Sequence, residues 1–405
     1  MRPEHEFLIS CIGRAFRDDR LGSPLPPPGG LDWGRFVSLC EWHNVAPLVC
    51  RTLPVALNGA VPHAAVSRLR GFHQNNTARS LLLAAELSRI LKAFNSSGIP
   101  AYPFKGPALS VMLYGDPARR QSKDLDILVP GETLRGAMKA LEAQGYRSKN
   151  GLDGARLSAH RRTEYEAALV RRDGRLQVEL QWAVVPGYFG FDHERLGIWS
   201  RLEKRTWSGM DFPVLPPEET LLMLCVHGAK HMWCKLGWVC DVAGLLEAPT
   251  PPDLSRTTEL ARQCGVLRLL RLGLLLAECL AGARLPQEVS ALIKADLMTA
   301  VLARQAQALI AKSPVNPDVD PARYLFYLKS KDGRRDQLLF AGRLMATLAA
   351  GEWNPSALPD ILAPLYYLLR PLHMAGRHGE PILRTLARRG KGDRQHFVLD
   401  TPIER

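Results

Sequence analysis

The spacing of apolar and polar residues changes twice along the 405-residue chain and predicts three regions with a tail. In residues 1–95 apolar positions recur every three or four residues, for example in "NNTARSLLLAAELSRILKAFNSSG", which predicts amphipathic helices. Residues 96–210 mix short runs of period two with helical segments. Residues 211–390 return to the helical spacing, and residues 391–405 are predicted to be a loose tail.

The middle region predicts a small sheet. The segment "IPAYPFKG" predicts a short strand that ends at Gly106, and Pro107 suits the first turn of a following helix. A second strand is expected at 123–129, followed by the helix "ETLRGAMKALEAQG". The segment "EYEAALVRRDGRLQVELQW" predicts a β-hairpin around its Asp-Gly turn. This order of elements predicts an α+β fold in which a sheet core is flanked by N-terminal and C-terminal helical regions.

The C-terminal region predicts several helices. "PPEETLLMLCVHGAKHMW" has a good helix start and is followed by the helical segment "LGWVCDVAGLLEA". Further helices are expected at about 255–285, 290–312, 334–350 and 376–389.

Composition and charge narrow the class of protein. The apolar fraction of 46% and the charged fraction of 23% are ordinary for a soluble globular protein. The net charge of +13 favours acidic partners such as nucleotides or nucleic acid, although basic residues spread over solvated faces explain it equally well. The eight cysteines form no CxxC pair, which fits a reducing cytoplasm. The apolar windows are short and interrupted, so no transmembrane segment is expected.

Two aspartates in "RRQSKDLDILVP" suggest the chemistry. Asp124 and Asp126 alternate with aliphatic residues, so on a strand both carboxylates lie on one face. A divalent cation between them would relieve their repulsion, and oxygen ligands favour Mg²⁺ or Mn²⁺. The alternative is a solvated edge strand. Glu179, on the polar face of the second hairpin strand, is the candidate third carboxylate; taken alone it is equally well a solvent-facing or cross-strand glutamate.

Two further groups are candidates for phosphate binding. Lys105 and Gly106 stand at a strand-to-helix junction, where helix N–H groups can reach a phosphate; a plain helix-entry turn is the alternative. His227, Lys230 and His231 fall on one face of a predicted helix, with Asp241 on the next helix. We expect this face to close over a triphosphate, with Lys230 neutralising the departing pyrophosphate. A buried histidine pair or, less simply, a zinc site would also explain the two histidines.

Three blocks of sequence, in this order, resemble the uncharacterised nucleotidyltransferase family of the polymerase-beta-like nucleotidyltransferase superfamily. They are "FKGPALSVMLYGDPARRQSKDLDILV", "VELQW" and "LMLCVHGAKHMWCKLGWVCDVAGLL", and the resemblance covers about residues 80–250. It implies a small mixed sheet, metal ligation by the three carboxylates and a phosphate loop at Lys105-Gly106, with Arg120 ahead of the aspartates. Arg120 and Lys123 are candidates for nucleotide binding, with solvated surface charges as the alternative. The chain departs from the family pattern at Pro107, where Ser or Gly is usual, and at Gln181, where His is common.

The resulting hypothesis is a metal-dependent nucleotidyltransferase in the cytoplasm. It would use Mg²⁺ or Mn²⁺ and an NTP, transfer the nucleoside monophosphate to a small molecule, peptide or RNA acceptor, and release pyrophosphate. One alternative is a catalytically inactive nucleotide-binding or scaffold protein of the same fold. Another is a toxin-like enzyme that modifies RNA, which the positive charge would favour. The sequence identifies neither the acceptor nor the oligomeric state.

Overall fold

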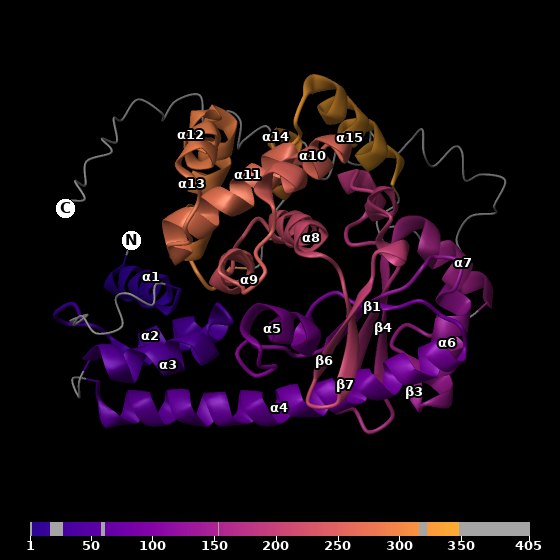
Figure 1. Cartoon of the computed structure of the whole chain (residues 1–405), viewed down its shortest axis with the longest axis horizontal. Coiled ribbons are helices and arrows are strands. Elements are labelled where there is room, and N and C mark those ends of the chain that lie inside the picture. Colours follow the sequence, from indigo (N-terminus) through magenta and orange to yellow (C-terminus); the bar gives the residue numbers. More distant parts are fainter. Residues whose placement is uncertain (1, 17–26, 58–60, 153, 316–321, 348–405) are drawn as a thin grey trace, which may run out of the picture.

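The structure is a computed structural model that describes residues 2–16, 27–57, 61–152, 154–315 and 322–347. Figure 1 shows a small sheet at one end of the molecule and a helical body at the other, which confirms the predicted α+β class. The predicted helix at 376–389 and the tail at 391–405 lie outside the described residues.

The described part of the first 95 residues is helical, as the periodicity predicted. The helices are α1 (Pro3–Ala15), α2 (Trp33–Trp42), α3 (Ala46–Leu57) and α4 (His63–Ser96). Helix α4 is long enough to run under both ends of the molecule (Figure 1). In its second half Leu83, Leu87, Ile90 and Phe94 are buried at helical spacing, because that face covers the sheet.

The sheet has the strand order β1-β2-β5-β4-β3. Strands β2 and β5 are parallel and the other neighbours are antiparallel, so the sheet is mixed, as the resemblance implied. The five strands are β1 (Tyr102–Pro103), β2 (Leu125–Leu128), β3 (Tyr146–Ser148), β4 (Glu166–Arg171) and β5 (Gln177–Gln181), and the helices between them are α5 (Gly106–Tyr114), α6 (Leu134–Ala143) and α7 (Gly154–Thr163). The hairpin predicted around the Asp-Gly turn is therefore confirmed as β4–β5.

A hairpin and three short 3₁₀ turns lead from the sheet to the helical body. The turns span Gly187–Phe189, His193–Leu196 and Ile198–Ser200, and the hairpin is β6 (Glu203–Trp207) with β7 (Met210–Val214). The region boundary expected at residue 210 falls inside this hairpin. Phe212 packs into the core of the sheet, whereas Leu215 packs into the helical core, so the chain passes from one core to the other within three residues.

The C-terminal helices match the expected positions as far as residue 347. They are α8 (Pro217–Lys230), α9 (Leu236–Leu246), α10 (Leu254–Gln263), α11 (Leu267–Leu276) with the π-helical turn η5 (Ala277–Ala281), α12 (Gln287–Ala295), α13 (Leu297–Ala311), α14 (Ala322–Lys329) and α15 (Arg334–Ala346). Helix α14 was not predicted.

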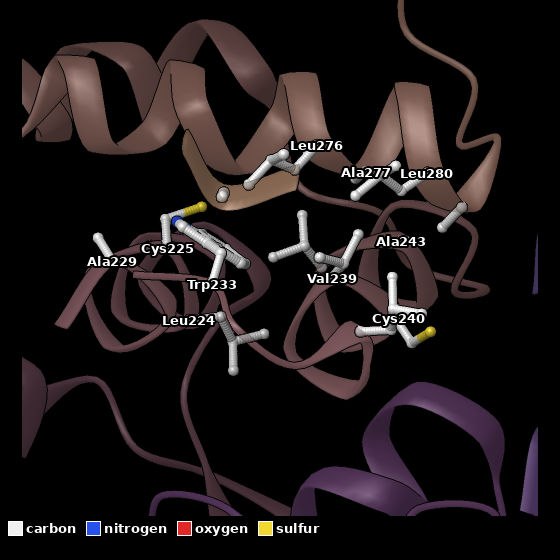
Figure 2. Packing of buried hydrophobic residues seen from close by; sticks show 14 of the residues in the cluster. Leu224, Cys225, Ala229, Trp233, Val239, Cys240, Ala243, Leu276, Ala277 and Leu280 are labelled. Atoms are coloured by element: carbon white, nitrogen blue, oxygen red, sulfur yellow. The ribbon is translucent and has the colours of Figure 1, made fainter. Parts of the chain in front are cut away.

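Two hydrophobic cores divide the molecule. The larger core joins residues of α1, α2 and α3 to the C-terminal helices, and the smaller core lies between the sheet, α4 and α6. Figure 2 shows part of the larger core, where Trp233 lies close to Cys225 and Leu276. The indole is fully buried, so its side chain belongs to the core.

The described residues contain no disulfide bond. Among the described residues no helix is both long enough and apolar enough to cross a bilayer.

Candidate functional site

A row of carboxylates lies on the polar face of the sheet. Strands β2 and β5 place Asp126 directly beside Glu179, and Asp124 precedes β2 by one residue. Asp126 is only 5% exposed, and the other two are half-buried. Glu166 of β4 joins the row, because it pairs with Gln181, two residues beyond Glu179. The structure thus brings together the three carboxylates that the sequence singled out, with a fourth beside them.

The four carboxylates of this row lie close together in a partly buried place, which disfavours full ionisation of all of them. Burial raises the pKa of Glu179 to about 8, helped by repulsion from Asp126, Glu166 and Asp124 and opposed by Lys105. The pKa of Asp124 is also raised, first by burial and then by Asp126. Like charges held together in a buried place favour the neutral form of one of them, or a bound cation.

Lys105 supplies the nearest positive charge. Its Nζ lies 2.8 Å from Oδ1 of Asp126 and 3.5 Å from Nε2 of His227. The same Oδ1 of Asp126 accepts a hydrogen bond of 3.0 Å from Nε2 of Gln181, which also lies 3.4 Å from Oε2 of Glu166. Asp126 is therefore held by a lysine and an amide in this structure.

The local backbone explains how Lys105 reaches the row. Strand β1 lies beside β2, and the N–H of Phe104 donates to the carbonyl of Asp126 at 3.0 Å. The chain then turns into α5 through Gly106, whose φ of +69° favours glycine, with Pro107 in the first helical turn. A Cβ at Gly106 would lie 3.7 Å from the carbonyl oxygen of Asp124, so this turn passes close to the aspartates.

The end of α8 covers the same face. His227 is buried, and its pKa lies well below the usual value because of burial and then the charge of Lys105, so the ring is neutral. His231 follows the helix and stacks on Trp238 with ring centroids 4.7 Å apart. The Lys230 ammonium donates to the hydroxyl of Tyr165. Burial lowers the pKa of Lys230, although Glu166 and Asp126 oppose the shift, which places its charge near the row.

The residues ahead of the aspartates are tied to α9 and α4. Arg120 makes a bidentate ion pair with Asp241 of α9, through Nε at 2.8 Å and a terminal nitrogen at 3.0 Å. The backbone N–H of Arg120 donates to Ser110 Oγ at 3.1 Å. Lys123 is exposed, and its carbonyl accepts a hydrogen bond from Arg79 of α4. The structure pairs Arg120 with Asp241, and their predicted role in nucleotide binding stays a prediction.

Sequence reasoning missed Glu166 and Tyr165. A signal for Glu166 was present, because the Asp173-Gly174 turn fixes the register of the hairpin and so places Glu166 opposite Gln181. Nothing in the local sequence indicates that Tyr165 meets Lys230, since the two residues are 65 positions apart.

The donor set of the row suits a hard divalent cation, because it consists of carboxylate oxygens. Within the described ranges, however, no three His, Cys, Asp or Glu side chains are gathered closely enough to hold a metal ion. At Asp126, Lys105 and Gln181 both contact Oδ1. The described residues likewise provide no third ligand for a zinc ion at His227 and His231.

A family model described as "Uncharacterised nucleotidyltransferase" matches residues 29–282 of the chain. The matched part runs from the loop before α2 to the end of η5, and it includes every residue of the predicted site. No curated protein matches the chain.

Proposed function

The chain belongs to the uncharacterised nucleotidyltransferase family, and on that premise we propose that it moves a nucleoside monophosphate from an NTP to an acceptor and releases pyrophosphate. The carboxylate row is the observation that supports this proposal. Asp126 and Glu179 are side by side on parallel strands, Asp124 is adjacent, and burial together with the neighbouring negative charges raises the pKa of Glu179 to about 8. A buried, polar cluster with perturbed pKa values is typical of a functional site.

Asp124, Asp126 and Glu179 would hold Mg²⁺ or Mn²⁺. When bound, such a cation neutralises charge on the triphosphate and on the oxygens that attack and leave the α-phosphorus. The row would bind a cation in preference to a neutral ligand, because a cation relieves the repulsion among three acidic side chains in a buried place.

The cationic residues around the row would take the phosphates. Lys105 lies 2.8 Å from Asp126, and in this proposal it exchanges that carboxylate for a phosphate oxygen when the cation binds. Gly106 lets the start of α5 approach the same phosphate, because its backbone adopts a positive φ and carries no side chain. Lys230, on the covering end of α8, would neutralise the pyrophosphate as it leaves.

The first test compares wild type with Asp126→Asn, which keeps the shape of the side chain and removes its charge. We expect wild type to bind Mn²⁺ with the non-hydrolysable nucleotide α,β-methylene ATP, as measured by electron paramagnetic resonance. Asp126→Asn should bind it at least ten-fold more weakly. Glu142→Gln is the matched control, since Glu142 is an exposed carboxylate on α6 away from the row. Equal affinity of wild type and Asp126→Asn would contradict the proposal.

A second candidate function is nucleotide binding without transfer. The Lys105–Asp126 ion pair and the Gln181 hydrogen bond favour it, because they fill the place where a cation would be held. The two functions are separated by pyrophosphate release from ATP, GTP, CTP and UTP, measured with amine, hydroxyl, peptide and tRNA acceptors. Binding of Mn²⁺ and nucleotide without release in any mixture would favour the second function.

A further inference from the structure

The amide of Gln181 lies inside the carboxylate row. Gln181 is the last residue of β5, and its side chain is only 3% exposed. Because side chains alternate along a strand, it points to the same face of the sheet as Glu179. Its Nε2 lies 3.0 Å from Oδ1 of Asp126 and 3.4 Å from Oε2 of Glu166. One amide nitrogen therefore contacts two of the four carboxylates.

The amide oxygen of the same side chain has no partner. Oε1 of Gln181 is buried, and no hydrogen-bond donor of the described residues reaches it. A buried carbonyl oxygen without a partner costs free energy, because it has lost its hydrogen bonds to water. The amide cannot turn this oxygen toward Asp126 and Glu166 without placing it against negative charge. The two carboxylates thus fix the amide and leave its oxygen available for a ligand.

Gln177 provides a direct comparison, since it is the first residue of β5 and points to the same face. Its Nε2 donates to Oε1 of Glu179 at 3.2 Å, so it also contacts the carboxylate row. Its amide oxygen, however, accepts a hydrogen bond of 2.7 Å from Nζ of Lys149. Within the described part of the chain, both ends of the Gln177 amide are paired, whereas only the nitrogen end of the Gln181 amide is paired.

An amide oxygen is a suitable ligand for the divalent cation proposed above. Carbonyl oxygens bind hard cations such as Mg²⁺ and Mn²⁺ together with carboxylates. The Asp, Glu, His and Cys side chains of the described ranges do not by themselves gather closely enough to hold a metal ion, so a ligand of another kind is needed. Gln181 supplies such an oxygen beside Asp126, in the most buried part of the row.

We propose that Gln181 is a further ligand of the divalent cation, which it binds through Oε1. The inference rests on the proposed function and adds a neutral oxygen to the ligands Asp124, Asp126 and Glu179. A neutral amide binds the cation without adding another negative charge to the row. It also keeps the ligand set entirely of oxygen, which favours Mg²⁺ or Mn²⁺ over Zn²⁺, an ion that an imidazole would suit.

The alternative is that Gln181 acts only as a hydrogen-bond donor to Asp126 and Glu166. The two roles predict changes of opposite sign in the affinity for the cation. An N–H donor competes with a cation for Oδ1 of Asp126, because both approach the same oxygen. Removal of a mere donor should therefore leave cation binding unchanged or make it tighter, whereas removal of a ligand should weaken it.

The first test measures binding of Mn²⁺ with α,β-methylene ATP by electron paramagnetic resonance. Gln181→Met replaces the amide by an apolar side chain of similar length, and we expect it to bind Mn²⁺ at least five-fold more weakly than wild type. Gln177→Met is the matched control, because it removes a donor from the same row but no unpaired oxygen. It should bind within two-fold of wild type. Binding by Gln181→Met that equals or exceeds that of wild type would overturn the inference, and so would an equal loss in Gln177→Met.

A second test detects the ligand directly. Gln181→His places an imidazole nitrogen near the position of the amide oxygen, and a nitrogen bound directly to Mn²⁺ gives a coupling in electron spin-echo envelope modulation that oxygen ligands do not give. We expect this coupling, beyond any in wild type, in Gln181→His and not in Gln177→His. Its absence from a Gln181→His variant that binds Mn²⁺ and has the wild-type circular dichroism spectrum would overturn the inference. If that variant does not fold or does not bind Mn²⁺, the affinity of Gln181→Met decides.

Failure of this inference differs from failure of the proposed function. If wild type binds no Mn²⁺ with the nucleotide, the proposed function fails, and the ligand role of Gln181 fails with it. If wild type and Asp126→Asn differ as expected but Gln181→Met binds like wild type, only the ligand role of Gln181 is overturned.

Discussion

Glu179 shows how one side chain can serve a site at the expense of stability. It lies beside Asp126 on the neighbouring strand, and its pKa is raised to about 8 by burial and then by Asp126, Glu166 and Asp124. The folded protein therefore holds a proton on Glu179 at pH values where the unfolded chain has released it. Residues placed for binding commonly carry such a cost.

We expect Glu179→Gln to be more stable than wild type at pH 8 in the presence of EDTA. Between the ordinary glutamate pKa of 4.5 and the folded value of about 8, the unfolded state binds fewer protons, so stability falls as pH rises. Glutamine removes this loss, which is on the order of 4 kcal/mol at pH 8. Urea unfolding at pH 5, 6.5 and 8 measures the difference in the free energy of unfolding between Glu179→Gln and wild type.

The advantage of Glu179→Gln should shrink toward pH 5, because that pH lies close to the ordinary pKa of 4.5 and little of the loss has accumulated there. Glu142→Gln serves as the control, because its carboxylate is exposed. An advantage of the same size at pH 5 and pH 8 would show that the effect comes from packing and not from the charge.

Among the elements, the turn after α8 sets the position of the covering face. Trp233 has a positive φ of 55°, and its ring folds back onto two glycines, Gly228 of α8 and Gly273 of α11. The ring is fully buried, so the turn is anchored in the larger core, near Cys225 and Leu276 in Figure 2. This anchoring fixes Lys230, which stands three residues earlier and faces the carboxylate row.

We expect Gly228→Ala to destabilise the protein by about 1–3 kcal/mol, because overpacking a filled core forces side chains to move. An added Cβ would lie 2.6 Å from ring atoms of Trp233. Equilibrium unfolding in urea measures the change. The matched control is Gly71→Ala in α4, where nothing lies within 4 Å of the added Cβ. That change should be neutral or stabilise by up to about 1 kcal/mol, since alanine favours a helix interior. Equal effects of the two substitutions would contradict this account.

Across the whole molecule, His43 connects the N-terminal helices to the C-terminal ones. It follows α2, and its carbonyl accepts the N–H of Gly237 at 2.9 Å. Its ring Nδ1 accepts the N–H of Leu236 at 3.3 Å, which requires an unprotonated nitrogen. Burial, followed by His5 and Lys235, lowers the pKa of His43 to about 3.

We expect this junction to make the fold sensitive to acid. The folded pKa is about 3 and the ordinary histidine value is 6.5, so the unfolded state binds the proton first as pH falls. The contribution of the neutral His43 ring to the free energy of unfolding is fully present above pH 6.5. It is lost as pH falls toward 3, at up to about 1.4 kcal/mol per pH unit. His43→Asn keeps an acceptor oxygen and does not titrate. Its free energy of unfolding should therefore fall less than that of wild type between pH 7 and 5; parallel losses would contradict the assignment.

Local patterns were enough to find β1, β2, β4 and β5, most helices and the candidate carboxylates, whereas β3, β6 and β7 were not predicted. Alternation with Leu125 and Ile127 placed Asp124 and Asp126 on one polar face, and the same rule placed Glu179 on the polar face of its strand. The Asp-Gly turn predicted the hairpin, and Lys105-Gly106 marked the strand-to-helix junction. These features depend on residues within one or two turns of each other, so a single sequence contains them.

The partners of those residues were decided by tertiary packing. The ion pair between Arg120 and Asp241 joins positions 121 residues apart, and Tyr165 meets Lys230 from another element. Residues 1–95 were predicted as a separate helical region, yet α1 to α3 share a core with the C-terminal helices. Apolar periodicity indicates which face of a helix is buried. It does not indicate which element covers that face, because the hydrophobic effect is non-directional and favours any apolar partner. The sequence therefore determined the polar and apolar faces, and only the packed chain decided which polar groups meet at the site.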